Sequence, residues 1–398
     1  MASYERGGPV EQISTPNLIV NQNSDNSGFK SKEGTRIVLP MQLKNLFKIS
    51  MFVVAVLAMS AVASAQVAIL PNYTQTATIV PTGGLLGGFD IGWVDQGSQR
   101  YYLTDRGLAP KAGQKGTGRI DVIDTQHNTF LYGIPTSSAE IGFTGGIPAT
   151  TPGCTISGPN GVVAIPQLNQ LYVGDGDSTV KVVDLAAKAI VAIIPTGGKC
   201  RADELAYDPL DHIIMITNPN DNPPFVTFIS ADTQTVLGTL TYPASQSGLE
   251  QPVWNPVTYR FDISVPATGM NLGSVDEIDP ITMKITNSFK ITCSPAGLAI
   301  GPNQHAMTSC GIVIDARVGN VLAVVSIAGS GDEIWYNPGD NNYYFGNANV
   351  AVINAETNQL VGYVTSAGGH SIAVDSNNNN IYVPVTGVGI KVFQPTRK

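Results

Sequence analysis

Along the chain, a polar position followed by an apolar run, a turn and a second apolar run recurs seven times. The first copy reads FDIGWVDQGSQRYYLTD and the last reads GHSIAVDSNNNNIYVPV. Short apolar or alternating runs bounded by turn residues predict β-strands. Aligned on the turn, the copies follow one another at intervals of 36–47 residues, after a first interval of 70 residues.

Repeats of about 40–45 residues that hold four strands each are typical of propeller blades. One blade cannot bury both of its faces, so blades stack around an axis and share their cores. Glycine (42) and proline (26) punctuate the β-branched and aromatic runs, and helix-forming stretches are scarce. We therefore predict an all-β fold, a seven-bladed β-propeller that spans residues 66–398.

The last copy supplies only three apolar runs, so another segment must complete its blade. The segment TQTATIVPTGG (74–84) resembles the end of VKVVDLAAKAIVAIIPTGG, which supplies the fourth run of the second copy. We predict that residues 74–80 form the missing outer strand, an N-terminal clasp that closes the ring. Closure matters because an open array exposes unpaired strand edges.

Residues 41–65 have the pattern of a secretory signal peptide. Lys44 and Lys48 accompany an apolar stretch over 49–59, and the small residues at 63–65 fit a cleavage site. The apolar stretch is too short for a good membrane span. Residues 1–40 are polar and aperiodic, and we interpret them as a disordered or untranslated leader. The mature protein is then secreted or periplasmic, with no membrane span.

Charge narrows the choice of partners. Without residues 1–65, 16 basic and 26 acidic residues remain, which gives a net charge near −10. Such a chain does not favour nucleic acid or anionic membranes. A small neutral or cationic ligand, or a protein or polymer partner, fits better. We expect a monomer, and the lack of a dinucleotide or phosphate-loop motif predicts no organic cofactor.

Four cysteines fit a compartment that permits disulfides. Cys154 and Cys200 each lie just before the leading polar position of consecutive copies, while Cys293 and Cys310 flank neighbouring runs of one copy. Of the three possible pairings we favour Cys154–Cys200 with Cys293–Cys310. Free buried thiols are the alternative, and the absence of a C-x-x-C motif argues against zinc held by cysteine alone.

The leading polar positions carry the candidate chemistry. The innermost strand of every blade runs along the axis, so residues at corresponding strand starts should converge at one mouth of the channel. Six of the seven are polar or charged and only Ala296 is not; the six are Asp90, Asn160, Asp203, Glu250, Asp332 and His370. Glu204 and Glu333 stand one residue further along.

Crowded carboxylates raise one another's pKa values unless a cation neutralises them. We predict a divalent metal held by Asp90, Asn160, Asp203, Glu250 and Asp332. Hard oxygen ligands favour Ca²⁺, whereas ligation by His370 would favour Mn²⁺, Fe or Zn²⁺. His370, Glu333 and Glu204 are the candidate catalytic acids and bases, since a neighbouring carboxylate poises a histidine near neutrality. The alternatives are carboxylates that cap loops and a site without metal.

Second-to-third-strand loops should open on the same face. They offer Asp105, Arg106, Asp175 and Asn218 as candidate substrate-binding residues; Arg106 suits an anionic group, or else a rim salt bridge. The insertions 107–119 and 135–158 are interpreted as a lid over the axis or as surface excursions. Trp93, Trp254 and Trp335 lie in innermost strands, either as core between blades or as a stacking platform.

The phrases LYVGDGD and IYVPVTG, with strand pairs such as VAVINAETNQLVGYV, resemble the YVTN-type β-propeller repeat family over most of residues 74–394. The asparagine that ends the family's eponymous phrase is absent. The resemblance implies a seven-bladed propeller in a secreted or surface protein. The layout is also similar to that of gluconolactonase-type propellers, which implies a divalent metal held at the axis by acids and asparagines.

Two functions remain open on these grounds. One is a metal-dependent hydrolase or lactonase-like enzyme with its acidic and histidine site at the axial mouth. The other is a non-catalytic ligand- or protein-binding propeller of the YVTN type. The fold does not choose between them, because propellers host both kinds of function.

Overall fold

The computed structural model describes residues 73–107, 117–137, 141–147, 153–246, 248–269, 272–326, 331–365 and 368–396. The expected leader (1–40) and signal peptide (41–65) lie outside these residues, as do parts of the two expected insertions, so these interpretations stay predictions. Residues 69–398 form one compact unit.

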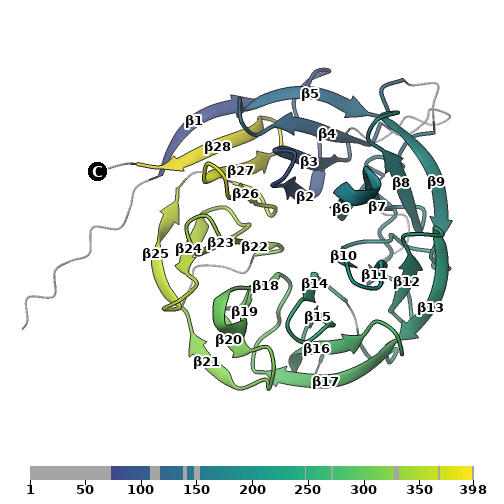
Figure 1. Cartoon of the computed structure of the whole chain (residues 1–398), viewed down its shortest axis with the longest axis vertical. Coiled ribbons are helices and arrows are strands. Elements are labelled where there is room, and N and C mark those ends of the chain that lie inside the picture. The colour runs from purple at the N-terminus through teal and green to yellow at the C-terminus, as the bar shows by residue number, and fades with distance from the viewer. Residues whose placement is uncertain are drawn as a thin grey trace, which may run out of the picture. The chain divides into compact units, whose positions relative to one another are not determined.

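The described part of this unit forms seven four-stranded antiparallel sheets arranged around one axis (Figure 1). Each innermost strand contacts the innermost strands of both neighbouring blades, so the ring is continuous. The prediction of an all-β, seven-bladed propeller is therefore confirmed. From blade 1 to blade 7 the innermost strands are β2 (Phe89–Asp95), β6 (Val162–Ile165), β10 (Leu205–Asp208), β14 (Pro252–Asn255), β18 (Leu298–Ile300), β22 (Ile334–Asn337) and β26 (Ala373–Asp375).

Each blade continues outwards from the axis in chain order. The second strands are β3 (Arg100–Asp105), β7 (Gln170–Asp175), β11 (Ile213–Asn218), β15 (Arg260–Val265), β19 (His305–Thr308), β23 (Asn342–Phe345) and β27 (Asn380–Val385). The third strands are β4 (Arg119–Asp124), β8 (Thr179–Asp184), β12 (Phe225–Ser230), β16 (Gly273–Asp279), β20 (Ile312–Asp315), β24 (Val350–Asn354) and β28 (Gly389–Pro395).

The outer strands are β5 (Thr129–Ile134), β9 (Ala189–Pro195), β13 (Thr235–Thr241), β17 (Lys284–Ile291), β21 (Val321–Val324), β25 (Gln359–Val364) and, in blade 7, β1 (Tyr73–Ile79). Among the described residues the helices are two 3₁₀ turns, η1 (Pro166–Leu168) and η2 (Pro302–Gln304). None of the helices described has the length and hydropathy needed to span a bilayer.

Burial explains the sequence pattern of the strands. Second and third strands such as β7 and β8 are covered on both sides by neighbouring blades and are almost wholly buried, so they read as continuous apolar runs. Outer strands such as β13 consist of exposed and half-buried positions because one face meets solvent. The core consists of hydrophobic clusters between blades; Tyr172 of β7, for example, packs with Ile214 and Ile216 of β11.

Blade 7 is completed by the two ends of the described chain. β1 pairs antiparallel with β28 from Tyr73–Pro395 to Ile79–Ile390, and the two strands lie side by side in Figure 1. The Ile79 side chain is buried in the cluster between blades 7 and 1. The segment expected at residues 74–80 thus forms the outer strand of blade 7.

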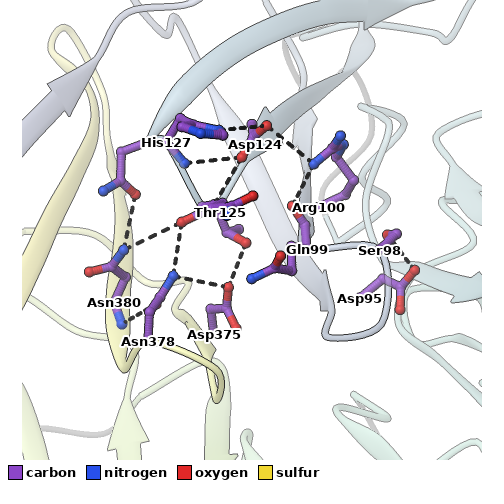
Figure 2. A network of polar contacts seen from close by, with 12 residues as sticks. Asp95, Ser98, Gln99, Arg100, Asp124, Thr125, His127, Asp375, Asn378 and Asn380 are labelled. Carbon is purple, nitrogen blue, oxygen red and sulfur yellow. Dashed lines mark hydrogen bonds and ion pairs between the residues drawn. The ribbon is translucent and has the colours of Figure 1, made fainter.

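A polar network joins blades 7 and 1 at the face of turns between first and second strands (Figure 2). The Thr125 hydroxyl donates to Asp375 at 2.5 Å, and Asn378 Nδ2 donates to the Thr125 carbonyl at 2.9 Å. The Tyr382 hydroxyl donates to Asn128 Oδ1 at 2.7 Å. The asparagine-rich stretch 377–380 therefore contributes to ring closure.

Both expected disulfides are present. Cys154–Cys200 links the loops that precede blades 2 and 3. Cys293–Cys310 links the loop that precedes blade 5 to the loop between its second and third strands. The favoured pairing is confirmed, and the alternative of free thiols is wrong. Two disulfides are compatible with a secreted protein.

Candidate functional site

The leading residues of the repeats lie at the starts of the innermost strands. Asp90 is the second residue of β2, and its counterparts lie two or three residues before their own strands. Because each blade starts at the axis, these residues gather at one end of the axial channel. We call this end the mouth and define it by Asp90, Asn160, Asp203, Glu250, Asp332 and His370.

Two arginines join half of the mouth. Arg106, which follows β3, donates from Nη2 to Asp90 Oδ2 and, over 2.6 Å, to Asn160 Oδ1. Arg201 lies before β10; its Nη2 is 2.6 Å from Asp203 Oδ2 and its Nη1 is 3.5 Å from Asp90 Oδ2. The acids of blades 1 and 3 therefore meet cations of this chain, and this half is not a bare acidic ring.

The arginines separate the pKa values of two neighbouring acids. Burial acts to raise the pKa of Asp90, but Arg106, His370 and Arg201 together outweigh it and lower that pKa to about 2. Burial raises the pKa of Asp203 to about 8, against the opposing charge of Arg201. Asp90 is thus ionised at neutral pH, while Asp203 keeps most of its proton.

The other half of the mouth contains Glu250, Asp332 and His370. Burial and the charge of Asp332 raise the pKa of Glu250 to about 7, and burial and Asp90 raise the pKa of Asp332. Burial acts to lower the pKa of His370, but its contact with Asp90 outweighs burial and raises that pKa. The His370 ring stacks on Phe89 at 4.8 Å between centroids.

Three of these residues are close enough to share one ion. Asp90, Asp332 and His370 each offer a donor atom, and these atoms lie within 4.8 Å of one another. Oδ1 of Asp90 lies 3.3 Å from His370 Nε2, while Oδ2 faces the arginines. The other predicted ligands, Asn160, Asp203 and Glu250, do not belong to this group, and the first two are bound by arginines.

A second polar layer lies one residue deeper. Glu333 is buried; its Oε2 accepts from the Ser371 hydroxyl at 2.7 Å and from the Ile372 amide at 3.0 Å. Burial, helped by Asp332, raises the pKa of Glu333 to about 8 although both donors oppose this. Gln251 Oε1, at the start of blade 4, accepts in a similar way from the backbone amides of Leu298 in blade 5 and Ile334 in blade 6.

The side chain of Glu204 differs from those of Glu333 and Gln251. Its side chain is buried, and within the described part of the chain no hydrogen bond or ion pair to its carboxyl group is found. Burial and the nearby acids, Asp203 first, raise its pKa well above the ordinary range. The sequence predicts catalytic roles for Glu204 and Glu333, and these stay predictions.

Of the four predicted substrate-binding residues, Arg106 lies in the mouth network. The other three are engaged within the protein: Asp105 is buried against Arg119 at 3.3 Å. Asp175 is fully buried and pairs with Lys181. Asn218 is also fully buried and donates to the Ser178 hydroxyl at 3.0 Å. We leave these three out of the candidate site, and their binding role has no support beyond the sequence.

Sequence reasoning missed Arg201 and Gln251. Arg201 lies two residues before Asp203, in a blade-to-blade loop that opens on the mouth, so its position was a usable signal. The other histidines lie elsewhere: His127 is near Asp124, His212 is near Asp232, and His305 is near Asn358.

A cavity of about 410 Å³ occupies the axis, lined by the innermost strands. Glu204 and Glu333 belong to its wall, together with Trp93, Trp254 and Trp335. The rings of Trp93 and Trp335 meet edge to face at 5.6 Å, so these two side chains from blades 1 and 6 contact each other at the axis.

No protein-family model matches the chain, so the YVTN resemblance is not confirmed, and no curated protein matches it either. Among solved structures, the WD40 β-propeller domain of Doa1 is similar, with 14% identity, a TM-score of 0.59 and coverage of 82% of this chain and 98% of that chain. A chain of the Mitotic Checkpoint Complex is similar with 11% identity, a TM-score of 0.61 and coverage of 84% and 96%. At these identities the likeness shows the fold alone.

Proposed function

We propose that this protein is a secreted binding propeller whose axial mouth holds a divalent cation. The observation that carries the proposal is the group formed by Asp90, Asp332 and His370, whose donor atoms lie within 4.8 Å of one another. Three blades contribute one donor each, so a bound ion would link segments that are far apart in the sequence.

The donor set favours a transition metal. Two carboxylates and one imidazole suit Mn²⁺, Fe²⁺ or Zn²⁺, whereas Ca²⁺ prefers six to eight oxygen ligands. Arg106 and Arg201 occupy Oδ2 of Asp90 and leave Oδ1, the atom that faces His370, for the ion. We therefore propose Mn²⁺ or Zn²⁺ in place of Ca²⁺.

Binding is favoured over hydrolysis because the two candidate catalytic acids, Glu333 and Glu204, take no part in the three-residue group. Glu333 directs Oε2 to Ser371 and Ile372, which gives it a structural use. Glu204 does not belong to the three-residue group. The similar solved structures include a chain from a complex, the Mitotic Checkpoint Complex, which agrees with a binding role for this kind of fold.

Isothermal titration of the chelator-treated full chain with MnCl₂, ZnCl₂ and CaCl₂ tests the proposal. We expect one saturable site for Mn²⁺ or Zn²⁺, and at 100 times the dissociation constant a stabilisation of about 2.7 kcal/mol. Asp332→Asn and His370→Gln should abolish it. Glu250→Gln is the matched control, because Glu250 lies in the same mouth but outside the group, and it should retain the site.

Two results would contradict the proposal. One is the absence of heat and of any melting shift with all three ions. The other is undiminished binding in both variants, which would place the ion elsewhere. Tighter binding of Ca²⁺ than of Mn²⁺ would show that His370 is not a ligand.

A further inference from the structure

The Glu204 carboxyl group lies in the wall of the axial cavity without a hydrogen-bond donor among the described residues. Its residue is 5% exposed, it lines the axial cavity, and no described side chain or amide donates to it. Glu333, in the same wall, accepts two hydrogen bonds. Burial keeps a proton on this carboxyl group, and a cation that enters the cavity would take the place of that proton and let Glu204 ionise.

Apart from Glu333 and Gln251, the rest of the cavity wall is mainly apolar and aromatic. Trp93, Trp254 and Trp335 come from blades 1, 4 and 6, and Tyr207 and Tyr336 stand in the same wall. The faces of such rings attract cations, most strongly the indole of tryptophan. The volume of about 410 Å³ is within the usual range for small-molecule sites.

We propose that the axial cavity binds an organic cation, a protonated amine with an apolar body, with its ammonium group at Glu204 and its body against the three tryptophans. A bare metal ion fits this place poorly, because Glu204 is the one carboxyl group of the described cavity wall that has no donor, and hard ions need several oxygen ligands. An ammonium group needs only one carboxylate, and the apolar walls favour its hydrocarbon part.

This site is distinct from the metal group at the mouth. Asp90, Asp332 and His370 are absent from the cavity wall, and the tryptophans are absent from the metal group. The organic-cation site therefore goes beyond the proposed function and does not depend on it.

The chain offers a built-in probe, because it contains three tryptophans and all three line the cavity. We would titrate the full chain with 4-phenylbutylamine at pH 7 in the presence of a chelator and follow tryptophan fluorescence. The matched ligands are 4-phenyl-1-butanol and 4-phenylbutyrate, which replace the cation by a neutral group and by an anion. A charge-assisted contact with Glu204 should make the amine bind roughly tenfold or more tightly than the alcohol.

Variants locate the cation. Glu204→Gln should bring the affinity for the amine down to that for the alcohol. Asp279→Asn, which removes an outer carboxylate paired with Arg260, should leave the ratio of the two affinities unchanged. Trp335→Phe should weaken both ligands in parallel because it reduces the aromatic wall.

Equal affinities of the amine and the alcohol for the unmodified chain would overturn the proposal without any variant. So would a fluorescence change that does not saturate, or an undiminished preference for the amine in Glu204→Gln. Because every titration contains a chelator, these results are independent of whether the mouth binds a metal.

Discussion

Replacing Glu333 by glutamine should make the protein less sensitive to alkaline pH. Oε2 of Glu333 accepts from Ser371 and Ile372, and the carbonyl oxygen of a glutamine accepts the same two bonds. The substitution therefore removes the ionisable group with little change in packing. Since burial raises the pKa of Glu333 to about 8, the folded protein keeps this carboxyl protonated over a range where the unfolded chain releases the proton.

The sign follows from proton linkage. An unfolded glutamate titrates near 4.5, so between about pH 4.5 and pH 8 the folded state holds one more proton than the unfolded state. The contribution of Glu333 is fully present below pH 4.5 and is lost as the pH rises through 8. At about 1.4 kcal/mol per pH unit, the loss in the free energy of unfolding is about 5 kcal/mol. The raised pKa values of Asp203 (about 8) and Glu250 (about 7) also make the free energy of unfolding fall with pH. This contribution is the same in the unmodified chain and in Glu333→Gln.

Urea unfolding at pH 5, 6, 7 and 8, in chelator so that no divalent ion ionises the acids, measures the difference. With each pH unit from 5 to 8, the free energy of unfolding of Glu333→Gln should rise by about 1 kcal/mol relative to that of the unmodified chain. Asp279→Asn is the control, because Asp279 is an outer carboxylate paired with Arg260 at 3.0 Å and its pKa is lowered. Parallel pH profiles of the unmodified chain and Glu333→Gln would refute the reasoning, since they would mean that Glu333 ionises as it does in water.

Three further predictions concern the ring. Deleting residues 73–79 should lower the melting temperature strongly and expose the edge of the third strand of blade 7 to aggregation, and an unchanged melting temperature would show that this strand is dispensable. Replacing Cys154 and Cys200 by serine should cost about 4 kcal/mol of unfolding free energy, because the bond closes a 46-residue separation; a loss below about 1 kcal/mol in urea unfolding would contradict the loop-entropy estimate. A double-mutant cycle of Thr125→Val and Asp375→Asn should give a coupling of roughly 1–2 kcal/mol in the same assay, and additive effects would show that their 2.5 Å contact adds nothing to closure.

Much of the fold could be predicted from the sequence because its information is local and repeated. Each blade requires the same apolar runs and turns, so seven copies of one pattern indicate seven blades, and a missing fourth run in the last copy indicates that β1 completes it. Equivalent places in neighbouring repeats also predicted Cys154–Cys200, and neighbouring runs of one copy predicted Cys293–Cys310. The alignment of the seven copies also predicted that their leading residues lie together at the mouth.

The pairing of charges within the mouth was decided by the tertiary structure. Arg201 meets Asp90 across two blade boundaries, and Asp175 is buried beneath Lys181 instead of facing the mouth. A repeat pattern states which residues occupy equivalent places, but it does not state which side chains reach across an axis or lose their contact with water. Those outcomes depend on distances between residues far apart in the chain, and they leave Glu204 as the buried acid of the cavity wall without a partner among the described residues.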